Sequence, residues 1–145
     1  MTKIIVNILN VCMFLMVASV SFAQKVAESK VPGQVKTAFL KKYPEASKVT
    51  WEDEKGNFEA NWGGKSGEGT SVQYKPDGTF VEQVLAIPVS TLPLAVSDYV
   101  KANYKGAKIT EAGKVTDAKG VHMYEAEVKG KDLIFDENGK FLKKD

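Results

Sequence analysis

His122 is the only histidine in the chain, and it is the first residue to test for catalytic chemistry. Nucleophilic catalysis of the Ser-His-Asp or Cys-His type needs a nucleophile beside the base and a third group that orients the base. The only cysteine is Cys12, which lies in an apolar N-terminal run, and no Gly-x-Ser-x-Gly elbow occurs. His122 stands near Gly120 at the start of an expected strand, which favours an exposed strand histidine. We therefore expect no enzymatic activity.

The patterns that would hold a metal or a phosphate are incomplete. Residues 136–139, Asp-Glu-Asn-Gly, lack the alternating acidic series and the later glutamate of an EF-hand, and they are better interpreted as a hairpin turn. Zinc would require several His and Cys ligands. Gly64-Lys65-Ser66 has Glu59 at the position where a phosphate loop requires its first glycine. We expect no metal and no cofactor.

The densest acidic run is Glu52-Asp53-Glu54. Paired carboxylates can act as acid and base in glycoside hydrolysis, provided that a pocket raises the pKa of one of them. This run leads into the Lys55-Gly56-Asn57 turn, where charged side chains are usually solvated. Its position therefore favours a solvated turn over a catalytic pair.

The elements that position these residues occur twice along the chain, at a spacing of about sixty residues. Apolar residues recur at helical spacing after Pro32 and again after Pro93, and proline is tolerated where a helix begins. Beyond each helix the apolar period changes to two, as in strands with one buried and one wet face. The pattern predicts an α+β fold: a tandem repeat of a helix followed by about four antiparallel strands, with the helices packed on one face of the sheet or sheets.

The expected domain organisation has two parts. Residues 1–23 have a positive start, an apolar run and a Ser-Phe-Ala end, which are typical of a secretory signal peptide cut before Gln24. We expect residues 24–145 to form a single compact body of two repeats, at about 31–86 and 92–145, whose sheets join or abut. Residues 86–91 would form the joint between them.

Composition narrows the classes of partner. Removing residues 1–23 takes Lys3 and the only cysteine, so the formal net charge falls from +2 to +1 and no disulfide can form. Every basic residue is lysine, which leaves no arginine fork for phosphate or carboxylate. A nearly neutral chain has no general attraction to nucleic acid. We expect no nucleic-acid binding and no stable membrane insertion after cleavage.

The wet face of the strands is the candidate binding surface. Helices that cover the apolar face would leave the alternate residues of each strand in the open, although ordinary solvation explains such a face equally well. Trp62 has the parity of a core residue, but it lies next to a glycine-rich loop and could serve as an interface anchor. The candidate binding residues are Glu52, Glu59, Asn61, Trp62, Gln73, Lys75, Glu125, Glu127 and Lys129.

These segments resemble a known family. The leader, the helix with Phe39-Leu40-Lys41-Lys42-Tyr43, Val49-Thr50-Trp51-Glu52 and the Asp77-Gly78-Thr79-Phe80 turn are similar to the PepSY-like, β-lactamase-inhibitor-like family. The resemblance extends from Val31 to Leu142 and implies a small exported protein of Bacteroidetes-type bacteria with no demonstrated enzymatic activity. It supplies no set of functional residues to carry over, because likeness of fold does not establish function.

We therefore expect a periplasmic or secreted, non-enzymatic binding module, an inhibitor or sensor that acts through the open face of its sheet. Its partner would be a protein or peptide in the cell envelope. The alternative is a small-ligand carrier, which would need an apolar pocket between the helices and the sheet. The sequence indicates neither the partner nor the oligomeric state.

Overall fold

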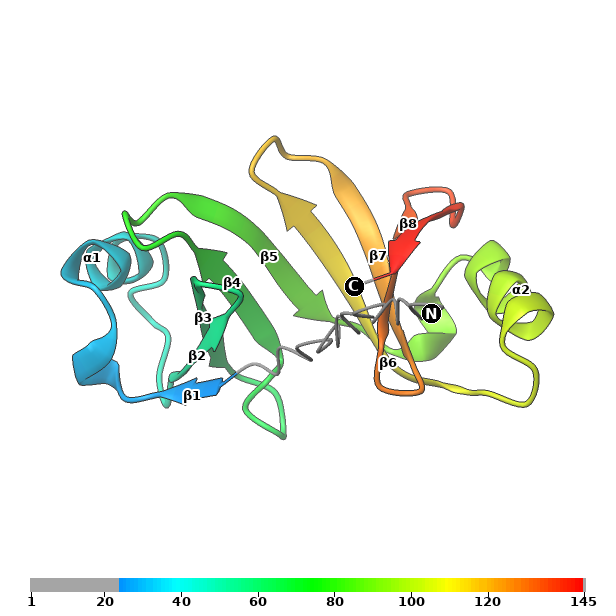
Figure 1. Cartoon of the computed structure of the whole chain (residues 1–145), viewed down its shortest axis with the longest axis horizontal. Coiled ribbons are helices and arrows are strands. Elements are labelled where there is room, and N and C mark those ends of the chain that lie inside the picture. Colours follow the sequence, from blue (N-terminus) through cyan, green and yellow to red (C-terminus); the bar gives the residue numbers. More distant parts are fainter. Residues whose placement is uncertain (1–23, 145) are drawn as a thin grey trace, which may run out of the picture.

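The computed structural model describes residues 24–144, so the expected signal peptide at residues 1–23 lies outside the described residues. Nine strands form one antiparallel sheet in which spatial order follows chain order (Figure 1). The elements are β1 (Gln24–Val26), η1 (Glu28–Lys30), α1 (Gly33–Lys42), β2 (Thr50–Glu54), β3 (Asn57–Trp62), β4 (Thr70–Tyr74), β5 (Phe80–Ala86), η2 (Val89–Thr91), α2 (Leu94–Asn103), β6 (Ile109–Asp117), β7 (His122–Val128), β8 (Asp132–Asp136) and β9 (Phe141–Lys144), where η marks a 3-10 turn. No helix within residues 24–144 is long and apolar enough to cross a membrane.

The expected α+β class with a tandem helix-plus-strands repeat is wrong. The chain is mostly β, because all nine strands pair in a single meander and each α-helix has only 10 residues. β5 pairs with β6 from Glu82 opposite Asp117 to Ala86 opposite Gly113. This ladder carries the sheet across the expected joint at residues 86–91. We refer below to the first half of the sheet (β1–β5) and the second half (β6–β9).

The first half is held by an aromatic core under α1. Val35 and Phe39 on α1 are buried, and the helix ends where the Tyr43 N–H donates to the Phe39 carbonyl, just before Pro44 blocks its continuation. The Phe39 ring lies 5.3 Å from the ring of Trp51 and 5.2 Å from that of Trp62, nearly perpendicular to both. Edge-to-face rings at this separation are a favourable arrangement in a core.

The second half has a separate core under α2. Val96 and Val100 on α2 are buried against Leu133 and Phe135 of β8. Tyr99 stacks on Phe141 with ring centroids 4.6 Å apart. Figure 1 shows the consequence of having two cores: α1 and α2 lie at opposite ends of the molecule, and β5 and β6 lie between them.

Truncation of Phe39 tests the first core. We expect Phe39→Ala to lower the free energy of unfolding by roughly 3–5 kcal/mol, because the site loses both apolar burial and its aromatic neighbours. Leu40→Ala on the same helix is the matched control, since Leu40 is 58% exposed and an exposed substitution costs less than about 0.5 kcal/mol. Urea unfolding followed by circular dichroism measures both. Equal costs for the two variants would contradict the described packing.

Candidate functional site

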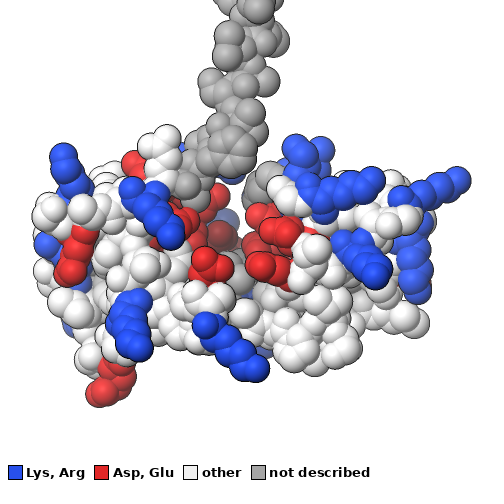
Figure 2. All heavy atoms as spheres, turned by 90° about the horizontal axis from the view of Figure 1, so that it is seen from below, with Lys and Arg blue, Asp and Glu red and all other residues white. Residues whose placement is uncertain are grey.

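The open face of the sheet is hollowed into a groove of about 380 Å³ between the two halves. Nine of its fifteen lining residues are Asp or Glu, and none of the described lining residues is a lysine. Figure 2 shows acidic side chains gathered around a hollow, with lysines farther out on the surface. We call this feature the acidic groove; it is lined by Glu52, Glu54, Glu59, Asn61, Glu68, Ser71, Glu82, Val84, Ala86, Glu111, Ala112, Gly113, Glu125, Glu127 and Asp132.

The register of the sheet brings the carboxylates of the first half together. Glu59 on β3 is opposite Glu52 on β2 and opposite Gln73 on β4, and Gln73 in turn is opposite Glu82 on β5. Side chains directly opposite one another on antiparallel strands share a face. Like charges in such a row repel, so three glutamates in one row raise the energy of this face.

The second half supplies the facing wall. Glu125 on β7 is opposite Gly113 on β6, and Gly113 is opposite Ala86 on β5. The ladder thus places Glu125 on the same open face as the glutamates of the first half. Glu127 lies two residues further along β7, and the Thr110 hydroxyl donates a short hydrogen bond to its carboxylate.

The floor of the groove is small and apolar, and it includes Val84 and Ala86 on β5 and Gly113 on β6. A Cβ atom added to Gly113 would lie 2.5 Å from Cγ1 of Val84, far inside van der Waals contact. Glycine at this position therefore allows Val84 to pack directly over the backbone of β6. Because these residues are small, they leave a hollow between the longer acidic side chains on either side.

Amide side chains hold one wall in place. The Gln73 Nε2 donates to Oε2 of Glu54 at 2.8 Å, and the Asn57 Nδ2 donates to Oε1 of Gln73 at 3.1 Å. These hydrogen bonds fix the Glu54 carboxyl group beside Glu59.

Two carboxyl groups of the groove have strongly raised pKa values. Burial raises the pKa of Glu59 to about 7, and the adjacent Glu54 adds to the rise. Burial also raises the pKa of Glu125 to about 8, with further contributions from the charges of Asp132, Glu82, Glu59 and Glu54. Each of these effects disfavours the charged form. Glu59 and Glu125 are therefore electrostatically linked across the groove, and both hold protons for part of the time near neutral pH.

Five of the nine predicted binding residues line the groove: Glu52, Glu59, Asn61, Glu125 and Glu127. Gln73 is opposite Glu59 on the neighbouring strand, and its side-chain amide donates a hydrogen bond to Glu54.

The other three predicted binding residues lie elsewhere. Trp62 packs on the helix side, with its ring 4.9 Å from that of Tyr43, because its parity is that of the core. Lys75 and Lys129 are exposed and lie just beyond the ends of β4 and β7.

Sequence reasoning missed five of the nine acidic residues that line the groove. Glu54 continues the period-two pattern from Glu52 and could have been included on that basis. Glu82, Glu111 and Asp132 gave no such signal. The face of the sheet on which each of them lies depends on how β5, β6 and β8 pair with their neighbours, and that pairing is not visible in the local sequence pattern. Glu68 comes from the glycine-rich connection between β3 and β4.

The other candidate sites are simpler. His122 is exposed at the start of β7, as expected from the sequence, and its Nδ1 lies 3.1 Å from the Thr116 hydroxyl oxygen. Among residues 24–144, no group of three or more His, Cys, Asp or Glu side chains is placed to hold a metal ion.

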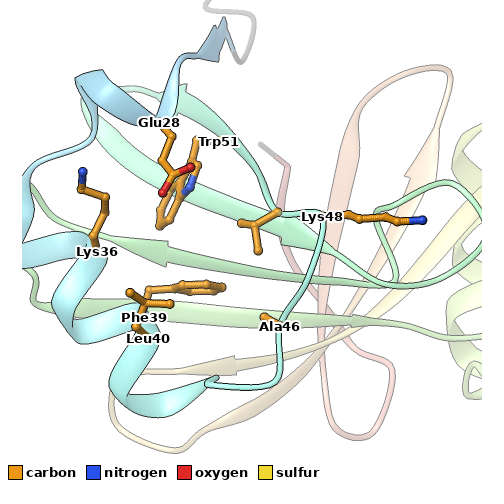
Figure 3. A pocket seen from close by; sticks show the side chains of 8 residues that line it. Glu28, Lys36, Phe39, Leu40, Ala46, Lys48 and Trp51 are labelled. Atoms are coloured by element: carbon orange, nitrogen blue, oxygen red, sulfur yellow. The ribbon is translucent and has the colours of Figure 1, made fainter.

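A second hollow of about 350 Å³ lies between α1 and the sheet. Figure 3 shows the rings of Phe39 and Trp51 on its walls, with Glu28 and Lys36 at its mouth. Its lining mixes apolar and charged side chains.

The raised pKa of Glu125 predicts how stability changes with pH. A carboxyl whose pKa is higher in the folded state than in the unfolded state stabilises the fold at low pH, and this contribution is lost as the pH rises from about 4.5 to about 8. Glu125→Gln removes the charge and should raise the free energy of unfolding by about 1–3 kcal/mol at pH 8.5. At pH 4.5 the variant and the parent should differ little.

Urea unfolding at the two pH values measures this effect. Glu45→Gln is the matched control, because Glu45 is exposed and is not one of the residues that line the groove. The parent chain should also be more stable at pH 5 than at pH 8.5. A Glu125→Gln variant that is less stable than the parent at pH 8.5 would contradict the described burial of this carboxyl.

Comparison with known proteins shows where this fold occurs. Residues 65–143 match the model of the family described as "Putative beta-lactamase-inhibitor-like, PepSY-like". A protein of Bacteroides eggerthii described as "putative periplasmic" has a TM-score of 0.64 at 20% identity, over 79% of this chain and 88% of that chain. A DUF2874 family protein of Bacteroides uniformis has a TM-score of 0.63 at 22% identity, over 79% and 88%. A BLIP-like protein of Bacteroides fragilis has a TM-score of 0.56 at 19% identity, over 79% and 85%.

No curated protein matches the chain. The solved structures, at these levels of identity, show the fold alone. The family model covers more than half of the chain, including β4 to β8 and most of the acidic groove. The resemblance noted in the sequence is thereby confirmed, and the chain belongs to the PepSY-like, β-lactamase-inhibitor-like family.

Proposed function

We propose that this protein is an exported, non-enzymatic binding module that holds a protein or peptide partner against the acidic groove. The observation that carries the proposal is the open face of the sheet, which is concave and polar and is covered by neither helix. Antiparallel sheets commonly have one solvated face, so an open face alone does not indicate binding. A concave face that concentrates one charge sign is a better candidate for recognition.

The partly protonated state of the groove supports the proposal. Glu59 and Glu125 are desolvated and are repelled by neighbouring carboxylates. Such an arrangement costs stability, and stability is commonly sacrificed where a surface serves binding. A partner that supplied compensating interactions would recover part of that cost.

The cellular location that we propose is the periplasm or the outside of the cell. The support is the signal-like segment at residues 1–23, with cleavage before Gln24, together with the description of the Bacteroides eggerthii protein as "putative periplasmic". We propose that residues 24–145 act as one compact body.

Inhibition of a partner enzyme is the finer form of the proposal, and it is supported by the family description and by the likeness of fold to the BLIP-like protein of Bacteroides fragilis.

The second candidate function is a small-ligand carrier that uses the hollow beside α1. It is favoured by the aromatic walls and by the adjacent charges of Glu28 and Lys36, which suit a small amphipathic molecule. The hollow is open at the surface and is bordered by Leu40, which is 58% exposed. The acidic groove remains the stronger candidate, because carboxylates from both halves converge on it.

Photo-cross-linking in the native cell envelope tests the proposed function. A benzoylphenylalanine at Ser71, which lines the groove, should cross-link a protein partner. The same probe at Glu45, which is exposed outside the groove, should not cross-link that partner.

Charge reversal by Glu59→Lys with Glu127→Lys should reduce the Ser71 cross-link at least about tenfold. Glu45→Lys with Glu137→Lys makes the same change in net charge outside the groove and should leave the cross-link intact. Equal cross-linking from both probe positions, or none from Ser71, would contradict the proposal.

A further inference from the structure

We propose that the occupant of the acidic groove is an extended protein segment that presents a row of lysine or arginine side chains. The aliphatic stems would lie on the floor and the cationic heads would lie between carboxylates from both halves. This inference rests on the proposed function and goes beyond it by naming the chemistry of the partner.

The floor fits the stem of such a side chain. Val84, Ala86 and Gly113 offer a low apolar strip, and Val84 fills the space where a Gly113 side chain would stand. Lysine and arginine bury their methylene groups along apolar surface while the charged end remains in a polar environment. A short acidic or purely polar side chain would leave this strip without contact.

The walls fit the charged ends. Carboxylates enter the groove from β2, β3, β5, β6, β7 and β8 and from the connection between β3 and β4. They are therefore spread along the hollow instead of being gathered at one point, as a single metal ion would require. Charge complementarity of this kind directs a cationic segment to the groove and rejects an anionic one.

An extended segment has the appropriate repeat. Alternate side chains of a strand point to the same side, at about 6.6 Å intervals. A segment with a basic residue at every second position would direct all of its charges into the groove and its other side chains away from it. None of the described residues that line the groove is a lysine.

Binding should be linked to protons, because the groups that face Glu59 and Glu125 are mostly acidic. Glu59 is surrounded by Glu52, Glu54, Asn61 and Gln73, and Glu125 by Glu54, Glu59, Glu82, Asp132 and Gly113. A cation between these carboxylates favours their ionised forms and lowers both pKa values. Protons are then released on binding, and affinity rises with pH up to the pKa values of the empty groove.

Isothermal titration calorimetry with two synthetic peptides tests the proposal on the chain from Gln24. The probe is a ten-residue peptide of alternating Lys and Thr, and the comparison is the same peptide with Glu in place of Lys. We expect the Lys-Thr peptide to bind at least about a hundredfold more tightly than the Glu-Thr peptide. We also expect about tenfold tighter binding at pH 8.5 than at pH 6, with proton release detected in buffers of different ionisation enthalpy.

Two variants with equal changes in charge separate the groove from general attraction. Glu59→Gln with Glu125→Gln should weaken binding about tenfold or more and should remove most of its pH dependence. Glu45→Gln with Glu137→Gln should change neither, because both residues are exposed and lie outside the groove lining. Circular dichroism of both variants establishes that they are folded. Equal weakening by the two pairs, or binding that does not depend on pH, would overturn the proposal.

Competition in the envelope distinguishes this inference from the proposed function. If the Ser71 probe captures a partner and the Lys-Thr peptide does not displace it, the cationic inference fails while the proposed function stands. If the peptide binds with the expected pH dependence but no partner is captured, the proposed function fails while the chemistry of the groove stands. A dimer of this chain that buries the groove and resists the peptide would overturn the inference in favour of a second copy.

Discussion

The ladder between β5 and β6 is the interaction on which the rest of the structure depends. Each half of the sheet has its own helix and its own core, so either half could bury apolar surface without the other. Among residues 24–144, only the pairing of Glu82–Ala86 with Gly113–Asp117 joins the two halves into one sheet. Without this ladder, Glu59 and Glu125 would lie on separate sheets, and the charge of Glu59 would not contribute to the raised pKa of Glu125.

The two faces of the sheet have opposite energetic roles. The helix side supplies stability through buried rings and aliphatic side chains, such as Phe39 and Phe135. The open side reduces stability, because burial and like charges act against the ionised forms of Glu59 and Glu125. An unfavourable charge arrangement in one place and strong packing in another is expected where a fold presents a binding surface.

Local periodicity predicted part of this structure well. The period-two pattern gave Glu59 and Glu125 the correct face, and the helix expected between Pro32 and Pro44 is present as α1 (Gly33–Lys42). The α+β class was wrong, because two short helices attached to a nine-stranded meander do not change its predominantly β character. Glu82 and Asp132 were missed because their faces depend on pairings between strands, and such pairings are not visible in the pattern of any one segment.

The central claim is that carboxyl groups from both halves share one desolvated groove. A pH titration of the glutamate carboxyl carbons by nuclear magnetic resonance, on the chain from Gln24, measures this directly. The described geometry predicts a pKa of about 7 for Glu59 and about 8 for Glu125, and it predicts that Glu59→Gln lowers the pKa of Glu125. Titration of both groups near 4.5, the ordinary value for glutamate, would contradict it.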